Sequence, residues 1–339
     1  LDSINTKINH RFNMGRSGFT YEPFYLFQLR MAGIYEVMNA IKNGSRNAQC
    51  WLPGFIINRT CNHLRSLARK KPTNVYLSIC DHFEPLLGGA SFETGLKRVR
   101  EWIDKYPKIA DMHRDSDGIL PKYTFFFPVE EYEPDYLTLL GGLCRKGYGE
   151  VEIHLHHDND TPENFKNTII QFKNILSKRH NLLCRDKESG EIAYGFIHGD
   201  WALDNSRPDG RMCGLNNEVQ ILQETGCYAD FTMPSVPDVT QSRIVNSIYY
   251  SVDDPKAPKS YNRGSSAKKG KKNYGLLMVQ GPLMLNWKNK KFGILPHIEN
   301  GAVSGQEIIT TERLELWIDA NIHVEGESGA IFIKLHSHG

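Results

Sequence analysis

Histidine and aspartate residues gather in four short runs of the 339-residue sequence, at positions 80–84, 154–160, 198–201 and 335–338. Imidazole and carboxylate groups together are suitable ligands for zinc, iron, manganese or cobalt. A metal with an open coordination position acidifies a bound water and polarises a carbonyl, as the hydrolysis of an amide or ester requires. The four runs therefore predict a metal-dependent hydrolase.

Each run stands at the end of a segment that has the length and pattern of a β-strand. From residue 73 onward, strands alternate with helices, which predicts βαβ units and a parallel sheet. The expected strands are 75–80, 122–127, 151–156, 192–198, 228–232, 274–279 and 330–336, and the expected helices are 92–105, 134–146, 162–179, 215–224 and 311–322. Seven such strands suit a (β/α) barrel or a large doubly wound sheet, and we expect the barrel; in both folds sites are built at the carboxyl ends of the strands.

The alternation of side chains along these strands predicts which residues face the barrel interior. In the strands that begin at 75, 151 and 330, every second residue is apolar and is expected to pack under the helices. His154, His156 and His336 then point inward. Cys80 also points inward, and Asp81 lies at the rim. Residues from separate strands are thus expected to meet at one mouth of the barrel.

At these residues the chain resembles the polysaccharide deacetylases, the NodB-homology superfamily. The first strand of that family ends in Thr-Phe-Asp-Asp-Gly, with a base followed by a metal ligand, and here Cys80 and Asp81 occupy those two positions. A second strand of the family carries two ligand histidines four residues apart, where this chain has His156 and Asp160. The Leu-x-His motif, which supplies a general acid, has its counterpart at His336, shifted by one residue.

The chain also departs from the pattern of that family. Because the base Asp is missing, His82, His157 or Asp200 is a candidate for its role, and an inactive protein is the alternative. Because Asp160 replaces a histidine, His157 and His154 are rival ligands. The family's third motif, which contains Arg-Pro, is absent, and the run 198–201 occupies that strand end.

The resemblance implies a hydrolase that removes acyl groups, in the first place acetyl, from a carbohydrate. Its cofactor would be one divalent metal ion, zinc in the first place, with iron, manganese or cobalt as alternatives. The expected metal ligands are Asp81, His156 and Asp160, the catalytic residues His336, His82 and Asp200, and the substrate-binding residues His154, His157, His198 and Trp201.

Two other functions remain open from the sequence. Glycoside hydrolases on a related seven-stranded barrel need two carboxylates that flank the scissile bond. Glu84, Asp200 and Asp230 are possible members of such a pair, but their spacing pairs none of them. The other alternative is an inactive barrel that only binds carbohydrate.

The composition of the chain bears on three questions: whether it binds nucleic acid, whether it spans a membrane, and in which compartment it resides. The 41 basic and 39 acidic residues give a net charge of +2, without the basic excess expected of a nucleic-acid-binding protein. No stretch approaches the roughly 20 apolar residues of a membrane span, and no signal peptide is recognised. The seven cysteines form no CxxC pair, which favours a reducing compartment, with the cytoplasm slightly preferred over the cell envelope.

Two domains are expected from the change in pattern along the chain. Residues 1–72 are predicted to form a helical extension, with helices over 27–42 and 55–70, and residues 73–339 the barrel. The lysine-rich segment 253–273 is expected to be a mobile loop beside the barrel mouth, where it would help to bind an acidic polysaccharide.

Overall fold

The structure is a computed structural model that describes residues 46–66, 74–271, 273–327 and 329–338. The chain divides after residue 45, and every described residue belongs to the second unit, 46–339. The helix expected over 27–42 lies outside the described residues. The expected domain boundary at residue 72 falls in the segment 67–73, which also lies outside them.

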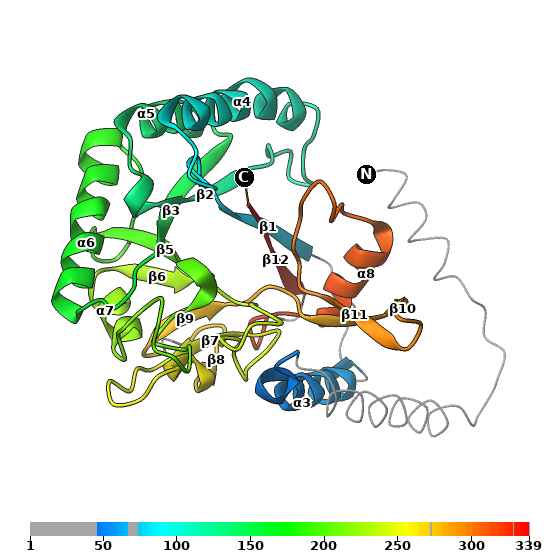
Figure 1. Cartoon of the computed structure of the whole chain (residues 1–339). Coiled ribbons are helices and arrows are strands. Elements are labelled where there is room, and N and C mark those ends of the chain that lie inside the picture. The colour runs from blue at the N-terminus through cyan, green and yellow to red at the C-terminus, as the bar shows by residue number, and fades with distance from the viewer. Residues whose placement is uncertain (1–45, 67–73, 272, 328, 339) are drawn as a thin grey trace, which may run out of the picture. The chain divides into compact units, whose positions relative to one another are not determined.

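A mostly parallel sheet forms the centre of this unit (Figure 1). In spatial order its strands are β12 (Ala330–His338), β1 (Asn74–His82), β2 (Tyr123–Pro128), β3 (Gly149–Leu155), β5 (Ile192–His198), β6 (Cys227–Asp230), β9 (Leu276–Val279), β7 (Ile248–Ser251) and β8 (Ser265–Ser266). The neighbours from β12 to β9 pair in parallel, whereas β7 pairs antiparallel with both β9 and β8. The short β4 (Cys184–Arg185) joins β5, and β10 (Met284–Lys291) and β11 (Leu295–Glu299) form a separate antiparallel sheet.

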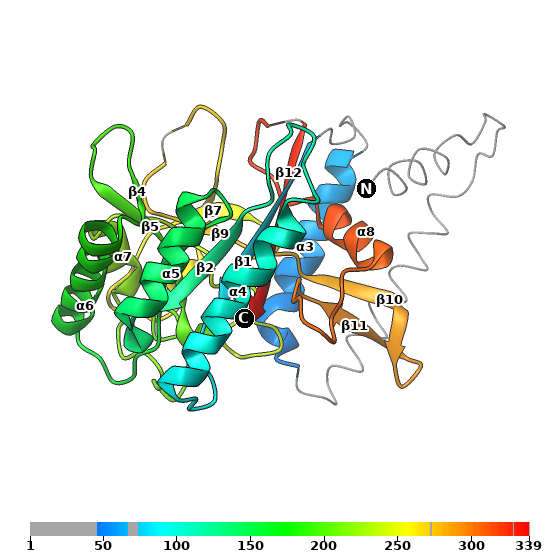
Figure 2. The same ribbon diagram turned by 90° about the horizontal axis from the view of Figure 1, so that it is seen from above.

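Four helices follow parallel strands of the sheet and lie on its convex face (Figures 1 and 2). They are α4 (Phe92–Ala110), α5 (Pro134–Arg145), α6 (Pro162–Asn174), which continues as the π-helical η2 (Ile175–Arg179), and α7 (Glu218–Glu224). Two further helices are α3 (Ala48–Ser66) and α8 (Thr311–Ala320), and three short 3₁₀ turns are η1 (Val129–Glu131), η3 (Gly199–Trp201) and η4 (Ser260–Asn262). Among the described residues, no helix is long and apolar enough to cross a membrane.

The prediction of a seven-stranded (β/α) barrel is wrong. The sheet curls into a half-barrel but stays open, because a strand has only two edges for pairing. β9 uses one edge for β6 and the other for β7, whose Ile248 lies opposite Val279. No edge of β9 is therefore left for β12. The physical cause is the segment after β6, which enters the sheet as β7 and β8 where a barrel would place a helix.

Each of the seven expected strands has a counterpart among the parallel strands of the sheet, and the expected direction of the side chains is confirmed in β3 and β12. In β1, Val75 and Leu77, which were expected to pack under the helices, are 47% and 49% exposed. Phe125, Ile153 and Leu140 share one fully buried core between the sheet and the convex-side helices. On the opposite face of the sheet, Cys80 packs with two other apolar side chains in a small separate core. Alternate residues of the strands therefore face opposite sides, and the concave side receives the polar ones.

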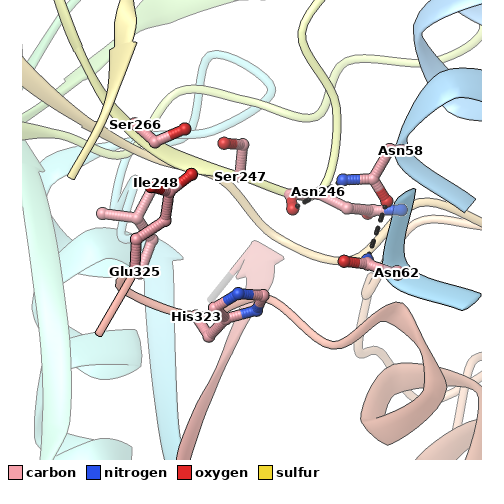
Figure 3. A pocket seen from close by; sticks show the side chains of 8 residues that line it. All are labelled: Asn58, Asn62, Asn246, Ser247, Ile248, Ser266, His323 and Glu325. Atoms are coloured by element: carbon pink, nitrogen blue, oxygen red, sulfur yellow. Dashed lines mark hydrogen bonds between the residues drawn. The ribbon is translucent and has the colours of Figure 1, made fainter. Parts of the chain in front are cut away.

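Helix α3 contacts the described unit through polar side chains near its middle. Asn58 Nδ2 donates to the Asn246 carbonyl at 3.4 Å, and Asn62 Nδ2 donates to the Ala320 carbonyl at 3.2 Å. Both asparagines line a small pocket (Figure 3). The other lining residues are Asn246, Ser247, Ile248, Ser266, His323 and Glu325. None of the histidines expected in the site lies in this pocket.

The lysine-rich segment 253–273 contains η4 and β8, and three of its lysines have partners. Lys259 Nζ donates to the Val239 carbonyl at 2.8 Å. Lys268 Nζ lies 2.9 Å from Glu325 Oε2, and Lys269 Nζ lies 2.6 Å from Glu327 Oε2. The charges of Lys268 and Lys269 are therefore partly neutralised within the chain.

Candidate metal centres

Polar side chains collect where the neighbouring strands β12, β1, β2, β3 and β5 end. His82 and His338 are the last residues of β1 and β12, and His198 is the last residue of β5. Glu130 lies in η1, directly after β2, and His156 follows β3. Because these strands are adjacent and parallel, their carboxyl ends bring the side chains to one edge of the curled sheet.

The first group of residues that could hold a metal ion consists of His82, Glu84 and His154, and we refer to it as the open cluster. One ligand atom from each residue lies within 4.8 Å of the others. His154 Nε2 lies 3.2 Å from Glu84 Oε1, and the rings of His82 and His154 are 4.8 Å apart. All three side chains are buried at the bottom of this edge.

Three further residues, which are more exposed than the cluster itself, surround the open cluster. His156 Nε2 lies 3.4 Å from Glu84 Oε1, and its Nδ1 makes a short hydrogen bond with Glu130. His338 Nδ1 lies 3.9 Å from the other oxygen of Glu84. The side chains of His156 and Glu130 are 34% and 38% exposed, so solvent reaches the open cluster from their side.

Electrostatics keep the open cluster in the protonation state that a cation needs. Burial raises the pKa of Glu84, but the imidazoles of His154 and His338 outweigh it and bring the pKa to about 2. Burial and the neighbouring histidines hold the pKa of His82 well below its usual value. Burial lowers the pKa of His156, yet the Glu130 carboxylate outweighs burial and the net shift is upward.

The second group consists of His157, His198, Cys213 and Glu218, and we refer to it as the closed cluster. Its ligand atoms also lie within 4.8 Å of one another. Glu218 Oε1 lies 3.3 Å from His157 Nε2 and 3.5 Å from His198 Nε2, and Cys213 Sγ lies 3.3 Å from Glu218 Oε2. Each of the four side chains is at most 7% exposed or fully buried, so the closed cluster is shielded from solvent.

Burial determines the direction of the pKa shifts of His198 and Cys213 in the closed cluster. It lowers the pKa of His198 to about 4 and raises the pKa of the Cys213 thiol far above its usual value. Burial also raises the pKa of Glu218, but the positive potential of His198 and His157 outweighs it, so the net shift is downward. The carboxylate is therefore ionised in the interior beside two imidazoles.

Asp81, an expected metal ligand, lies in neither cluster. Its Oδ1 accepts a hydrogen bond from Ser337 Oγ at 2.6 Å, and Ser337 Oγ lies 2.7 Å from the hydroxyl of Tyr123. Tyr123 belongs to the core under the convex-side helices. Burial raises the pKa of Asp81 to about 6, against the opposing effect of the Ser337 hydrogen bond.

The other expected site residues are divided between the two clusters and their surroundings. Asp160 lies beside the closed cluster, with Oδ2 3.2 Å from His157 Nδ1. Asp200 is exposed, and its negative charge contributes to the raised pKa of His156. Trp201 follows it in η3 and is half-buried. His336 is buried with Nδ1 unpartnered, and burial and Lys334 lower its pKa to about 3.

Sequence reasoning did not assign Glu84, Glu130, His338, Cys213 or Glu218 to a metal centre, and it named only Glu84, as a possible carboxylate of a glycoside hydrolase. The first three carry a signal that could have found them. Glu84 lies two residues after His82, and His338 lies two residues after His336, so each follows a histidine by one full period of the strand. Glu130 comes two residues after the end of the buried strand β2. Cys213 and Glu218 come from an irregular segment and the helix after it, where no periodic pattern points to a common site.

Imidazole, carboxylate and thiol groups at these separations are close enough to hold a metal ion in either cluster. The open cluster has an accessible side, which a catalytic metal site requires, whereas the closed cluster is enclosed as structural sites are. Comparisons of the chain with protein-family models, with curated proteins and with solved structures found no match.

Proposed function

We propose that the protein is a metal-dependent hydrolase with its active site at the open cluster. The observation that supports this proposal is the hydrogen-bonded pair of His156 and Glu130, which lies on the solvent side of His82, Glu84 and His154. A metal-binding group with a carboxylate-oriented imidazole beside it contains the parts that hydrolysis of an acyl bond needs.

The donors of the open cluster fit a divalent ion. His154 Nδ1 lies 2.9 Å from the carbonyl oxygen of Ile197, which can only accept, so Nδ1 carries the proton. The lone pair of Nε2 in the neutral ring then faces Glu84 Oε1 at 3.2 Å. Two buried acceptors, His154 Nε2 and Glu84 Oε1, repel each other at this distance unless a cation or a proton lies between them. Zinc is our first choice, and iron, manganese and cobalt accept the same donors.

A divalent ion bound here would supply Lewis acidity and an acidified water. His156 is placed to move the proton. Since Glu130 accepts from Nδ1, Nε2 of the neutral ring presents its lone pair toward the cluster. Nε2 would accept a proton from the attacking water and return it to the leaving oxygen or nitrogen, while Glu130 keeps the ring oriented and stabilises its charged form.

We propose an acylated carbohydrate, in the first place an acetylated one, as the substrate. The support for this step is the resemblance of the strand-end motifs to those of polysaccharide deacetylases. Asp200 and Trp201, in the segment after β5, stand close enough for the charge of Asp200 to act on His156. Trp201 follows Asp200 in the chain, and its half-buried ring would offer an apolar face to a sugar ring.

The test is a Glu130→Gln variant, with Glu133→Gln as the matched control. Glu133 is close in the chain but is the N-cap residue that precedes α5, and its side chain makes no capping hydrogen bond. We expect the purified protein, loaded with zinc, cobalt or manganese, to release acetate from acetylated glycans. Glu130→Gln should reduce turnover by roughly 10²–10⁴-fold without loss of metal, and Glu133→Gln should leave turnover unchanged.

Two outcomes would contradict the proposal. Acetate release that is absent with every metal, or equal in wild type and Glu130→Gln, would remove acyl hydrolysis at this site. Release of reducing ends in place of acetate would indicate a glycoside hydrolase.

A further inference from the structure

The closed cluster joins three parts of the chain: the loop after β3, the end of β5, and the segment that leads into α7. His157 comes from the loop after β3, and His198 is the last residue of β5. Cys213 lies in the irregular segment between η3 and α7, and Glu218 is the first residue of α7. The four side chains are buried, and the open cluster shares none of them.

The ring of His198 leaves a polar atom without a partner in this buried place. Its Nδ1 makes a short hydrogen bond with the carbonyl oxygen of Gly199, which can only accept, so Nδ1 carries the proton. In the neutral ring, Nε2 then has only a lone pair. Nε2 has no hydrogen-bond partner, and it lies 3.5 Å from Glu218 Oε1, which is also an acceptor. A bound cation would satisfy both atoms.

The backbone around Cys213 is arranged for a thiolate. The sulfur accepts hydrogen bonds from the backbone N–H groups of Asn205 at 3.2 Å and Leu215 at 3.4 Å. The thiol donates to Glu218 Oε2 at 3.3 Å. Two N–H donors stabilise negative charge on sulfur, and a metal ion would displace the proton.

Asp160 lies against two of the four residues from outside the cluster. Its Oδ2 lies 3.2 Å from His157 Nδ1 without forming a hydrogen bond, and its backbone N–H donates to the carbonyl of Cys213 at 2.9 Å. A carboxylate near the far nitrogen of a ligand histidine is common around zinc. Glu218 is itself fixed, because its Oε2 accepts from the Asp204 N–H at 2.6 Å.

We propose that His157, His198, Cys213 and Glu218 bind a second divalent metal ion, zinc by the chemistry of its ligands, in a structural site. Two imidazoles, a thiolate and a carboxylate complete a four-coordinate set with no position left for water. Magnesium and calcium prefer oxygen ligands and would not select this set. The ion would tie the segment 199–217 to the ends of β3 and β5, and its binding releases the Cys213 proton.

Cobalt substitution of the full chain tests the site, because a thiolate bound to Co²⁺ gives a sulfur-to-metal charge-transfer band in the near ultraviolet. We expect two metal equivalents per chain and this band in the wild type. Cys213→Ser should lose one equivalent and the band. Cys227→Ser is the matched control, since Cys227 is also buried but donates to the Ala229 carbonyl and lies outside both clusters, and it should keep both.

A variant of the open cluster separates this proposal from the proposed function. His82→Asn should lose the other equivalent and keep the band. A wild type without the charge-transfer band overturns the closed site, even if Cys213→Ser fails to fold. Cys213→Ser that retains two equivalents and the band also overturns it. Neither result depends on any hydrolytic activity.

Discussion

Asp81 and His82 are consecutive residues of β1, and their side chains lie on opposite faces of the sheet. The Asp81 carboxylate accepts from Ser337 on the convex side, beside the core tyrosine Tyr123. The His82 ring lies 4.8 Å from the ring of His154 on the concave side. The pleat of the strand produces this separation, since successive side chains point in opposite directions. Only His82 therefore reaches the open cluster.

Metal content should distinguish these two neighbours. We expect His82→Asn to lose the metal of the open cluster, because it removes one of three buried donors. Asp81→Asn should retain that metal, because the amide oxygen can still accept from Ser337 and the cluster is unchanged. Elemental analysis of both purified variants measures the difference. Equal metal loss in both would place Asp81 in the site after all.

Gly199 should be essential for the position of His156. A methyl group at Gly199 would overlap the His156 ring, so Gly199→Ala must displace the imidazole from Glu84 and Glu130. We expect turnover to fall at least tenfold while the fold is kept. Gly142→Ala in α5 is the matched control, because its Cβ would meet only ordinary contact distances and alanine favours a helix by about 1 kcal/mol. A fully active Gly199→Ala would contradict the proposed role of His156.

Asp230 should make stability depend on pH. Burial raises its pKa from 3.8 to about 7, against the hydrogen bonds from Thr232 and the charge of Lys334, while the charge of Glu218 adds to the rise. The folded state thus holds a proton that the unfolded state releases near pH 4. The stability contributed by Asp230 is complete below about pH 4 and is lost as the pH rises through about 7.

Replacing Asp230 by Asn removes this dependence and leaves an acceptor for Thr232. Relative to wild type, Asp230→Asn should gain stability between pH 4 and pH 8. A shift of about three pH units at about 1.4 kcal/mol each sets the upper limit near 4 kcal/mol. Urea unfolding of both proteins at the two pH values measures the gain. A constant difference between them would show that Asp230 does not titrate in this range.

The buried ion pair of Arg313 and Glu299 should hold α8 to β11. Arg313 donates from Nε and Nη2 to the two carboxylate oxygens at 2.7 and 2.8 Å, and Trp317 Nε1 donates to the same carboxylate at 2.8 Å. Arg313→Met leaves that carboxylate buried without its counter-charge. We expect a loss of about 3–5 kcal/mol in the free energy of unfolding.

The more exposed pair of Arg59 and Asp319, at 2.7 Å, is the control for Arg313→Met. Arg59→Met should cost no more than about 1 kcal/mol, because solvent screens this pair. Denaturant unfolding at pH 7 compares the two variants. Similar small losses in both would show that the Arg313 pair contributes little to stability.

Much of the site could be predicted from local pattern. The alternation in β3 correctly separated Ile153, which packs in the core, from His154 and His156, which face the concave side. The parallel strands from β1 onward and the helices after them also follow from periodicity and from signals such as Thr161, whose side chain caps α6. These features depend on residues that are close in the chain, so the sequence carries them directly.

Asp81 was expected at the rim of the site, although in the alternation of β1 it has the same phase as Ile79. The resemblance to deacetylases nevertheless suggested it as a ligand, since the family has an aspartate at this motif position. In the structure the pleat prevails, and Glu84, two residues after His82, occupies the cluster in its place. The phase of the strand therefore predicts which side chains reach the cluster better than the alignment with the family motif does.

The sequence by itself determined the order of the parallel strands and of the helices between them, the faces of β3 and β12, and the concentration of histidines at strand ends. Only the tertiary structure decided that β7 takes the free edge of β9 and leaves the sheet open. It also decided that Cys213 and Glu218 join His157 and His198. Strand pairing and the closure of an irregular segment depend on contacts between residues far apart in the chain, and such contacts leave no periodic trace in the sequence.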